Sequence, residues 1–176
     1  MNDYYYHRAS PLEAGIFESD VALKDLSENK NKASQVYLAE PVHLKLLDDI
    51  DYQSLEDILF TPLPLIRNDV LDSLLSINLF QTQFLPVDIE QDERFSEDYF
   101  ILYNYNMIPV KEAIVQTEKD SNTVNKNINW DNLERRPLEQ RMLFYIENEP
   151  NITIVHQSVK NIFNEAEIEW DFTKFS

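Results

Sequence analysis

The histidines are the first candidates for catalysis or metal binding in this chain, because no cysteine is present. His7, His43 and His156 are far apart, and none has a second histidine or a carboxylate three or four residues further on. Two metal ligands share one helical face when they are three or four residues apart. Ser158 follows His156 by two residues, which is typical of a helix cap rather than of a nucleophile beside its base. We therefore expect no catalytic residue, no metal and no cofactor.

Glycine and cysteine usage argues against several enzyme classes. Gly15 is the single glycine among 176 residues. Phosphate-binding loops, dinucleotide fingerprints and nucleophile elbows all use glycine for tight turns or close backbone approach. The lack of cysteine removes disulfides, thiolate zinc sites and cysteine nucleophiles, and it fits a reducing compartment. The composition favours a binding protein over an enzyme.

Acidic side chains form the most informative pattern. One group runs from Asp88 to Asp98 with Arg94 as its basic residue, and a second runs from Asp48 to Asp57 with no basic residue. Neither group has the alternation around a central glycine that an EF-hand calcium loop requires. Two interpretations stay open. The groups are either solvated loops or a surface for a basic protein, since concentrated charge raises association rates and selects partners.

The whole chain is acidic, with a formal net charge of -17. Bare nucleic acid is an unfavourable partner, because binding it requires Lys and Arg to replace counterions. The first eight residues lack the basic start and apolar run of a secretory signal, and no apolar stretch approaches the ~20 residues that span a bilayer. We expect a cytoplasmic protein that binds neither nucleic acid nor membrane, as a monomer or weak homodimer.

Hydrophobic periodicity predicts short helices placed between strands. Val70, Leu74 and Ile77 share one face of a helix over residues 68–77. Residues 83–89 and 99–107 alternate as strands, and we interpret the acidic residues between them as a loop. The remaining pattern predicts a helix at 158–166, one short helix within 11–33, a mobile loop at 117–132, and strands at 4–7, 35–38, 42–47, 152–155 and 168–172.

These elements predict an α+β fold with a central, mainly antiparallel sheet flanked by short helices. The order strand, helix, strand at residues 66–89 recurs at residues 155–172, which suggests a repeated unit. A hydrophobic content of 43% supports a sizeable core, and the length suits one domain over residues 1–176. A small N-terminal subdomain ending near Thr61 is the alternative.

The order of elements resembles a family of bacterial immunity proteins from polymorphic toxin systems, immunity protein family eleven, formerly a domain of unknown function. The resemblance covers residues 60–174. It rests on the helix at 68–77, the run Gln-Phe-Leu-Pro-Val at 83–87, the aromatic strand at 99–106, and residues 152–166 with the strand that follows. It implies a cytoplasmic bacterial protein that binds and neutralises a cognate antibacterial toxin, delivered by a type VI or related secretion system. It implies no catalytic residues.

Three other functions stay open on the sequence. The chain could be an acidic module that mimics nucleic acid, an adaptor or chaperone for a secreted effector, or a hydrolase that acts on a toxin product. The first two use the acidic surface for binding, whereas the third needs an active site that no motif indicates.

The two acidic groups define the predicted toxin-binding site. Each group follows a predicted strand, so their loops would form one anionic rim if both strands belong to one sheet and end on the same side. Nearby aromatic side chains would supply the desolvated anchors, while the carboxylates set the association rate. The predicted site comprises Asp48, Asp49, Asp51, Tyr52, Asp88, Glu90, Asp92, Glu93, Phe95, Glu97, Asp98 and Tyr99.

Overall fold

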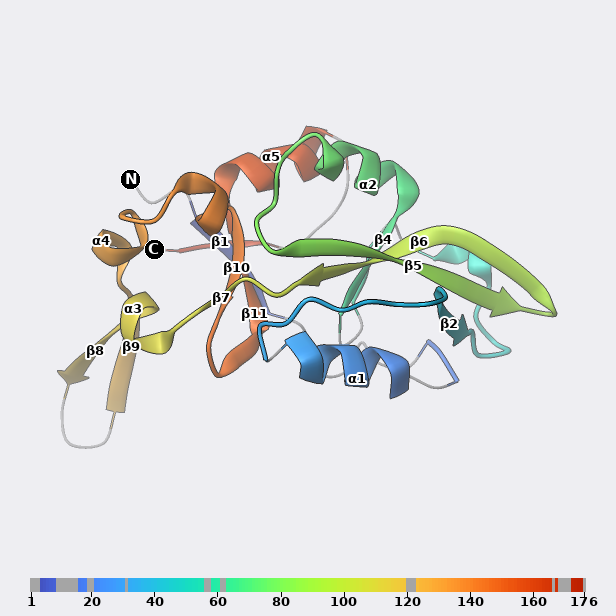
Figure 1. The fold of residues 1–176 in the computed structure, drawn as a ribbon, viewed down its shortest axis with the longest axis horizontal. Coiled ribbons are helices and arrows are strands. Elements are labelled where there is room, and N and C mark those ends of the chain that lie inside the picture. The colour runs from blue at the N-terminus through green and yellow to red at the C-terminus, as the bar shows by residue number, and fades with distance from the viewer. Residues whose placement is uncertain are drawn as a thin grey trace.

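The fold consists of two five-stranded sheets, a separate two-stranded hairpin and short helices (Figure 1). The structure is a computed structural model that describes residues 4–8, 16–18, 21–30, 32–55, 58–60, 63–119, 123–165, 167 and 172–175. Two strand pairs are parallel and the other pairs among these residues are antiparallel. The predicted α+β class is confirmed, with the strands divided between two sheets.

The first sheet joins the two ends of the chain. Its strand order is β12, β1, β11, β10, β7. The strands are β1 (Tyr4–Arg8), β7 (Met107–Ile108), β10 (Leu143–Ile146), β11 (Glu149–His156) and β12 (Thr173–Lys174). The strands predicted at 4–7 and 152–155 are confirmed. Of the strand predicted at 168–172, all but Phe172 lies outside the described residues.

The second sheet carries the acidic segments. Its strand order is β2, β5, β6, β4, β3. The strands are β2 (Val42–Lys45), β3 (Ile58–Phe60), β4 (Pro64–Arg67), β5 (Thr82–Gln91) and β6 (Arg94–Asn104). The inward alternation predicted for β2 is confirmed, because Val42, Leu44 and Leu46 are all buried.

The helices are α1 (Val21–Lys30), α2 (Asn68–Leu75), α3 (Val110–Ala113), α4 (Trp130–Leu133) and α5 (Gln157–Glu165), with 3₁₀ turns η1 (Tyr52–Ser54) and η2 (Leu138–Arg141). The three helices predicted from periodicity therefore exist. The predicted capping role of Ser158 is wrong. His156 precedes α5, and its Nδ1 accepts the Ser158 backbone N–H at 3.2 Å, so the imidazole satisfies a free helix N–H instead.

The order strand, helix, strand occurs in both sheets, although the last strand of the second unit is β12 at 173–174 and not the predicted 168–172. β4 and β5 each pair antiparallel with β6, so they run parallel to each other and α2 connects them. β11 and β12 each pair antiparallel with β1, and α5 connects them in the same way. α2 and α5 contact each other and lie side by side along one face of the molecule (Figure 1).

Hydrophobic residues form three clusters around the two sheets. One cluster lies between the second sheet and α1 and includes Leu23, Leu44 and Tyr99. Another lies under α2 and α5 and contains residues of both sheets, among them Leu102 and Val155. Residues 99–103 of β6 are therefore packed on both faces, and not on one face as their alternation suggested, whereas residues 94–98 are mostly exposed.

Two segments predicted as loops are paired strands. The acidic residues between 88 and 98 belong to one long hairpin of β5 and β6, and its turn is limited to Asp92 and Glu93. Residues 114–128 form β8 (Ile114–Lys119) and β9 (Thr123–Ile128), paired antiparallel. Both segments were predicted as loops because polar residues dominate them, but the hydrogen-bonded pairing of two strands does not require hydrophobic residues. Residues 35–38 are not a strand.

Candidate binding groove

The two acidic groups meet because β2 and β5 are parallel. Their register runs from Val42 beside Val87 to Lys45 beside Glu90, and the backbone N–H of Leu46 continues it by donating to Glu90 O at 3.0 Å. Both strands therefore end at the same edge of the sheet. The two strands thus belong to one sheet and end on the same side, as a shared acidic rim requires.

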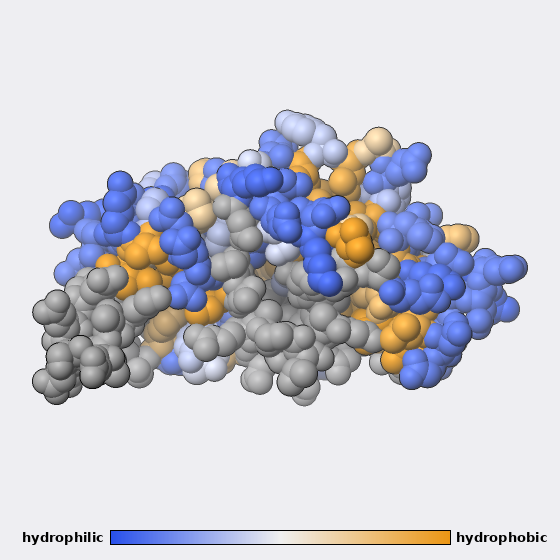
Figure 2. Space-filling view, turned by 90° about the horizontal axis from the view of Figure 1, so that it is seen from below, coloured by the Kyte–Doolittle hydropathy of each residue, from blue (hydrophilic) through white to orange (hydrophobic). Residues whose placement is uncertain are grey.

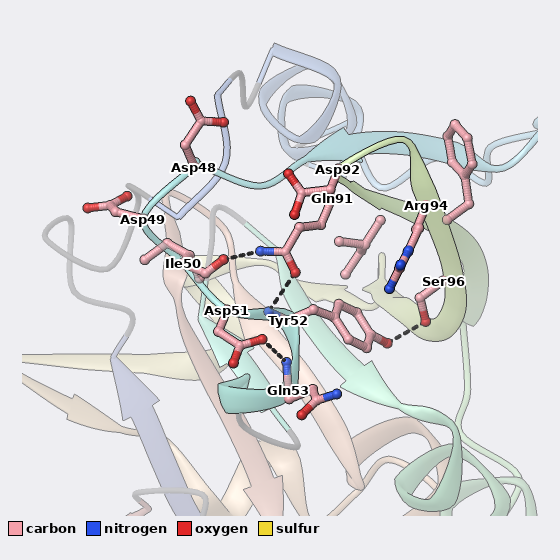
Figure 3. A pocket seen from close by; sticks show the side chains of 12 residues that line it. Asp48, Asp49, Ile50, Asp51, Tyr52, Gln53, Gln91, Asp92, Arg94 and Ser96 are labelled. Carbon is pink, nitrogen blue, oxygen red and sulfur yellow. Dashed lines mark hydrogen bonds between the residues drawn. The ribbon is translucent and has the colours of Figure 1, made fainter.

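Gln91 fixes the loop after β2 against the hairpin. Its side chain accepts the Tyr52 backbone N–H at 3.0 Å and donates to the carbonyl of Ile50 (Figure 3). Asp51 accepts the Gln53 backbone N–H at 3.0 Å and so caps the η1 turn. Since these bonds use backbone groups, the loop is held without consuming the carboxylates of Asp48 and Asp49, which are exposed.

The loop and the hairpin enclose a groove of about 540 Å³, which we call the acidic groove. Its lining residues are Asp48, Asp49, Ile50, Asp51, Tyr52, Gln53, Ile89, Gln91, Asp92, Arg94, Phe95 and Ser96 (Figure 3). The hairpin projects at one end of the molecule in Figure 1, and the same end is mostly hydrophilic in Figure 2 with a small hydrophobic patch beside it.

A β-bulge in β6 aims Ser96 into the groove. Val87 pairs with Tyr99 and Ile89 pairs with Ser96, so between these pairs one residue of β5 lies opposite two residues of β6. Residues three positions apart in a regular strand point to opposite faces of the sheet. The extra residue of the bulge instead places Ser96 on the same face as the buried Tyr99. Without the bulge, strict alternation would have turned Ser96 away from the groove.

Tyr52 links the loop to β6 through Ser96 and Asp98. Its hydroxyl donates to Asp98 Oδ2 at 2.9 Å and contacts Ser96 Oγ at 2.5 Å, while Ser96 Oγ donates to Asp98 Oδ2 at 2.7 Å. Burial raises the pKa of Tyr52 to about 12, so the phenol stays protonated as a donor. Hydrogen bonds from Ser96 and then Tyr52 lower the pKa of Asp98, so its carboxylate persists in mild acid.

Six of the predicted site residues line the acidic groove: Asp48, Asp49, Asp51, Tyr52, Asp92 and Phe95. Asp98 is attached to it through Tyr52, while Glu93 and Glu97 are exposed on the hairpin outside the lining. Tyr99 was predicted to be a surface anchor, and this is wrong. Its side chain has 0% exposure, because it packs in the cluster beneath Tyr52 and accepts a hydrogen bond from Arg67 at 3.0 Å.

Phe95 presents its ring on the opposite face of the hairpin from Ser96, the next residue. Its cross-strand partner is Glu90, and His43 contacts both residues. The ring centroids of His43 and Phe95 are 5.4 Å apart, and His43 Nε2 lies 2.9 Å from Glu90 Oε2. The ring is 61% exposed. Phe95 therefore borders the groove while offering its aromatic surface beside it, and Glu90 belongs to that second face. Asp88, half-buried, precedes the groove on β5.

The predicted site did not include four residues that line the groove without adding negative charge. Gln91 and Arg94 flank the turn, and Ile50 and Ile89 supply apolar lining. Gln91 is the last residue of the alternation that began at residue 82, so extending β5 to the turn would have found it. Arg94 forms no ion pair with any residue that the structure describes, so the groove keeps a negative balance.

Among the described residues, the groove does not contain a nucleophile paired with a base. The Tyr52, Ser96 and Asp98 group has no histidine to act as the base for a serine nucleophile. Across the described ranges, no three residues among His, Asp and Glu are placed to hold a metal ion. In the same part of the chain, no helix is both long and apolar enough to cross a bilayer.

No protein-family model matches this chain, and no curated protein is similar to it. The resemblance to the immunity proteins therefore stays a prediction. The inference about function rests on the groove.

Proposed function

We propose that this protein is a non-catalytic inhibitor that binds a basic protein in the acidic groove. The observation that carries the proposal is the convergence of two separate acidic segments on one groove. Carboxylates of Asp48, Asp49, Asp51 and Asp92 border it, with Arg94 as its basic residue. Such a field attracts a basic partner and speeds its association.

The resemblance to immunity proteins supplies the kind of partner. We propose a cognate antibacterial toxin, delivered between cells by a type VI or related system and blocked in the bacterial cytoplasm. The half-buried Tyr52 and the exposed Phe95 offer the aromatic contacts that dominate binding energy in protein interfaces. Occlusion of the toxin's active site is the simplest mode for a groove with a projecting hairpin.

Co-expression with the protein encoded immediately upstream tests this function. Rescue of growth together with a stable complex supports an immunity protein. Rescue from many unrelated nucleases indicates a nucleic-acid mimic, and chemical turnover without a complex indicates an enzyme. A stable complex with an upstream protein that is harmless to cells indicates an adaptor or chaperone.

The role of the groove is tested by neutralising its rim. The variant Asp48→Asn, Asp49→Asn, Asp51→Asn and Asp92→Asn should slow association about tenfold at low salt and flatten its salt dependence. Asn at position 51 still caps η1. A matched control changes exposed acids outside the groove: Asp72→Asn, Asp131→Asn, Glu134→Gln and Glu139→Gln.

The two quadruple variants have the same net charge, so a site-specific effect must appear in the first alone. Equal association rates in stopped-flow would mean that total charge, and not the groove, steers binding. Phe95→Ala should instead speed dissociation, with a cost of about 2 kcal/mol if its ring is an anchor.

A further inference from the structure

A second exposed feature lies on the segment that leads into β2. Residues 34–38 belong to no helix, strand or turn and run as a stretched trace in Figure 1, and the chain bends at Ala39 and Glu40. Tyr37 is 87% exposed and Leu38 is 40% exposed, although the neighbouring Ser34 and Val36 form hydrogen bonds with the second sheet. The hydrogen bonds between Val36 and Gln83 place this segment beside β5, and its trace leads into β2 in Figure 1.

The side-chain amide of Gln83 bonds to the backbone of this segment as the backbone of a neighbouring strand would. The Val36 backbone N–H donates to Gln83 Oε1 at 3.0 Å, and Gln83 Nε2 donates to Val36 O at 2.9 Å. The hydroxyl of Tyr103 donates to Ser34 O at 2.8 Å. Both polar groups of Val36 therefore point towards β5.

The neighbouring backbone groups must point outward. In an extended chain, the N–H and C=O of successive residues alternate between the two sides. Gln35 and Tyr37 therefore aim theirs away from β5, and no described residue forms a backbone hydrogen bond with either of them. Pro41 has no N–H and limits the open stretch on its far side.

Beyond β2, the same side of the chain forms an isolated antiparallel bridge. Phe17 pairs antiparallel with Leu46, with Glu18 N donating to Lys45 O at 2.8 Å and Leu47 N donating to Ile16 O at 3.0 Å. The residues of this edge that bond away from β5 are Lys45 and Leu47, which are odd-numbered like Gln35 and Tyr37. The edge thus has the geometry for an added antiparallel strand, and no residue in the described part of the chain pairs with the backbone of residues 35–38 on their outward side.

We propose that residues 35–38 accept a β-strand from a basic protein partner. Addition of a strand to an exposed edge is a common mode of peptide recognition, with main-chain bonds supplying affinity. A second copy of this chain is disfavoured, because both copies would carry -17. Tyr37 offers a cross-strand contact for a β-branched side chain. Since Gln83 preorganises the edge, little ordering entropy is lost on binding.

The test uses the full chain labelled with nitrogen-15 and a short peptide of alternating lysine and valine. The control peptide contains D-valine, which keeps charge and composition but cannot form a regular strand of L-residues. The first peptide should shift the amide signals of residues 35–38 and slow hydrogen exchange at Tyr37 about tenfold. The control should leave exchange at Tyr37 unchanged.

Two variants separate backbone pairing from side-chain contact. Tyr37→Pro removes the outward N–H and leaves the Val36 bonds to Gln83, so peptide-dependent shifts at residues 35–38 should be lost. Tyr37→Ala keeps the N–H and should retain them. A retained Val36 amide signal shows that the proline variant is folded. If that variant does not fold, the comparison between the L-valine and D-valine peptides on the natural protein still tests the proposal.

The proposal is overturned if both peptides perturb the same residues, or if shifts occur at the acidic groove alone. Equal binding by the proline variant would overturn it as well. The edge is separate from the acidic groove, so these results leave the proposed inhibitor function standing.

Discussion

At the scale of residues, the scarcity of glycine forces other side chains into left-handed backbone. Among the described residues, positive φ angles occur at Ala33, Gln81, Asp92, Glu93, Asn148 and Glu167. Asp and Asn adopt this region readily, whereas Glu, Gln and Ala carry a Cβ that crowds the following carbonyl. The turn that forms the tip of the hairpin, with φ of 50° at Asp92 and 61° at Glu93, combines both kinds.

Replacing Glu93 by glycine should therefore stabilise the protein. Two-residue hairpin turns with both φ angles positive favour Asp-Gly, so Glu93→Gly should raise the free energy of unfolding by about 0.5–1 kcal/mol. Urea denaturation measures it. Glu93→Gln keeps the Cβ and removes the charge, and an equal gain from it would show that repulsion rather than backbone strain was relieved.

Lys30 is a buried cation at the end of α1. Its ammonium lies 4.7 Å from the centre of the Tyr145 ring, and burial lowers its pKa to about 8. The folded state thus binds this proton less tightly than the unfolded state. Between pH 10.5 and pH 8 the unfolded state therefore binds more protons than the folded state. The free energy of unfolding is highest above pH 10.5, the ordinary pKa, and decreases as the pH falls from 10.5 through 8.

Lys30→Met should remove this dependence. Relative to the Met variant, the natural protein should lose on the order of 2–3 kcal/mol of stability between pH 10.5 and pH 8. Chemical denaturation of both proteins across this range gives the difference curve. Lys24→Met, on the exposed face of the same helix, serves as the control and should show a flat difference. A flat curve for Lys30→Met would mean that its ammonium is effectively solvated.

At the scale of elements, the extended segment before β2 depends on one side chain. Gln83 forms two hydrogen bonds with Val36, and no described residue forms a backbone-to-backbone bond with Val36. Gln83→Leu should therefore speed exchange of the Val36 amide about tenfold while leaving β5 and β6 protected. Pro86→Ala, at an exposed position of β5, is the matched control. Unchanged exchange at Val36 would show that packing of its side chain holds the segment.

At the scale of the whole molecule, the cluster under α2 and α5 couples the two sheets. It contains Tyr5 and Val155 from the first sheet and Ile66 and Leu102 from the second. β1, β2 and β3 also pair with strands that follow Thr61, so the early part of the chain is interleaved with the late part. This arrangement favours one cooperative unit over a separate N-terminal subdomain.

Phe163→Ala tests this coupling, because the side chain is 1% exposed in the shared cluster. The cavity should cost about 3–4 kcal/mol and lower the protection of slow amides in both sheets by the same amount. Leu44→Ala, in the cluster beside α1, gives a comparable core truncation. Loss of protection confined to one sheet in either variant would establish two unfolding units.

The sequence by itself determined the class of fold and the periodic elements. The helices at α2 and α5, the inward residues of β2 and the repeated unit follow from local hydrophobic spacing, which the chain carries in its own order. The acidic residues of the groove were also identified, because charge concentration is visible without a structure. Segments 88–98 and 117–132 were mistaken for loops, since polar residues on a ribbon have no period that marks burial.

Tertiary structure alone decided which residues share the acidic groove. The parallel pairing of β2 with β5 joins residues about forty positions apart, and no local pattern encodes that register. The bulge before Tyr99 and the bond from Arg67 to its hydroxyl determine that Ser96 faces the groove while Tyr99 is buried. Long-range pairing sets such facing, because a shift of one residue in a strand turns its side chains to the other face.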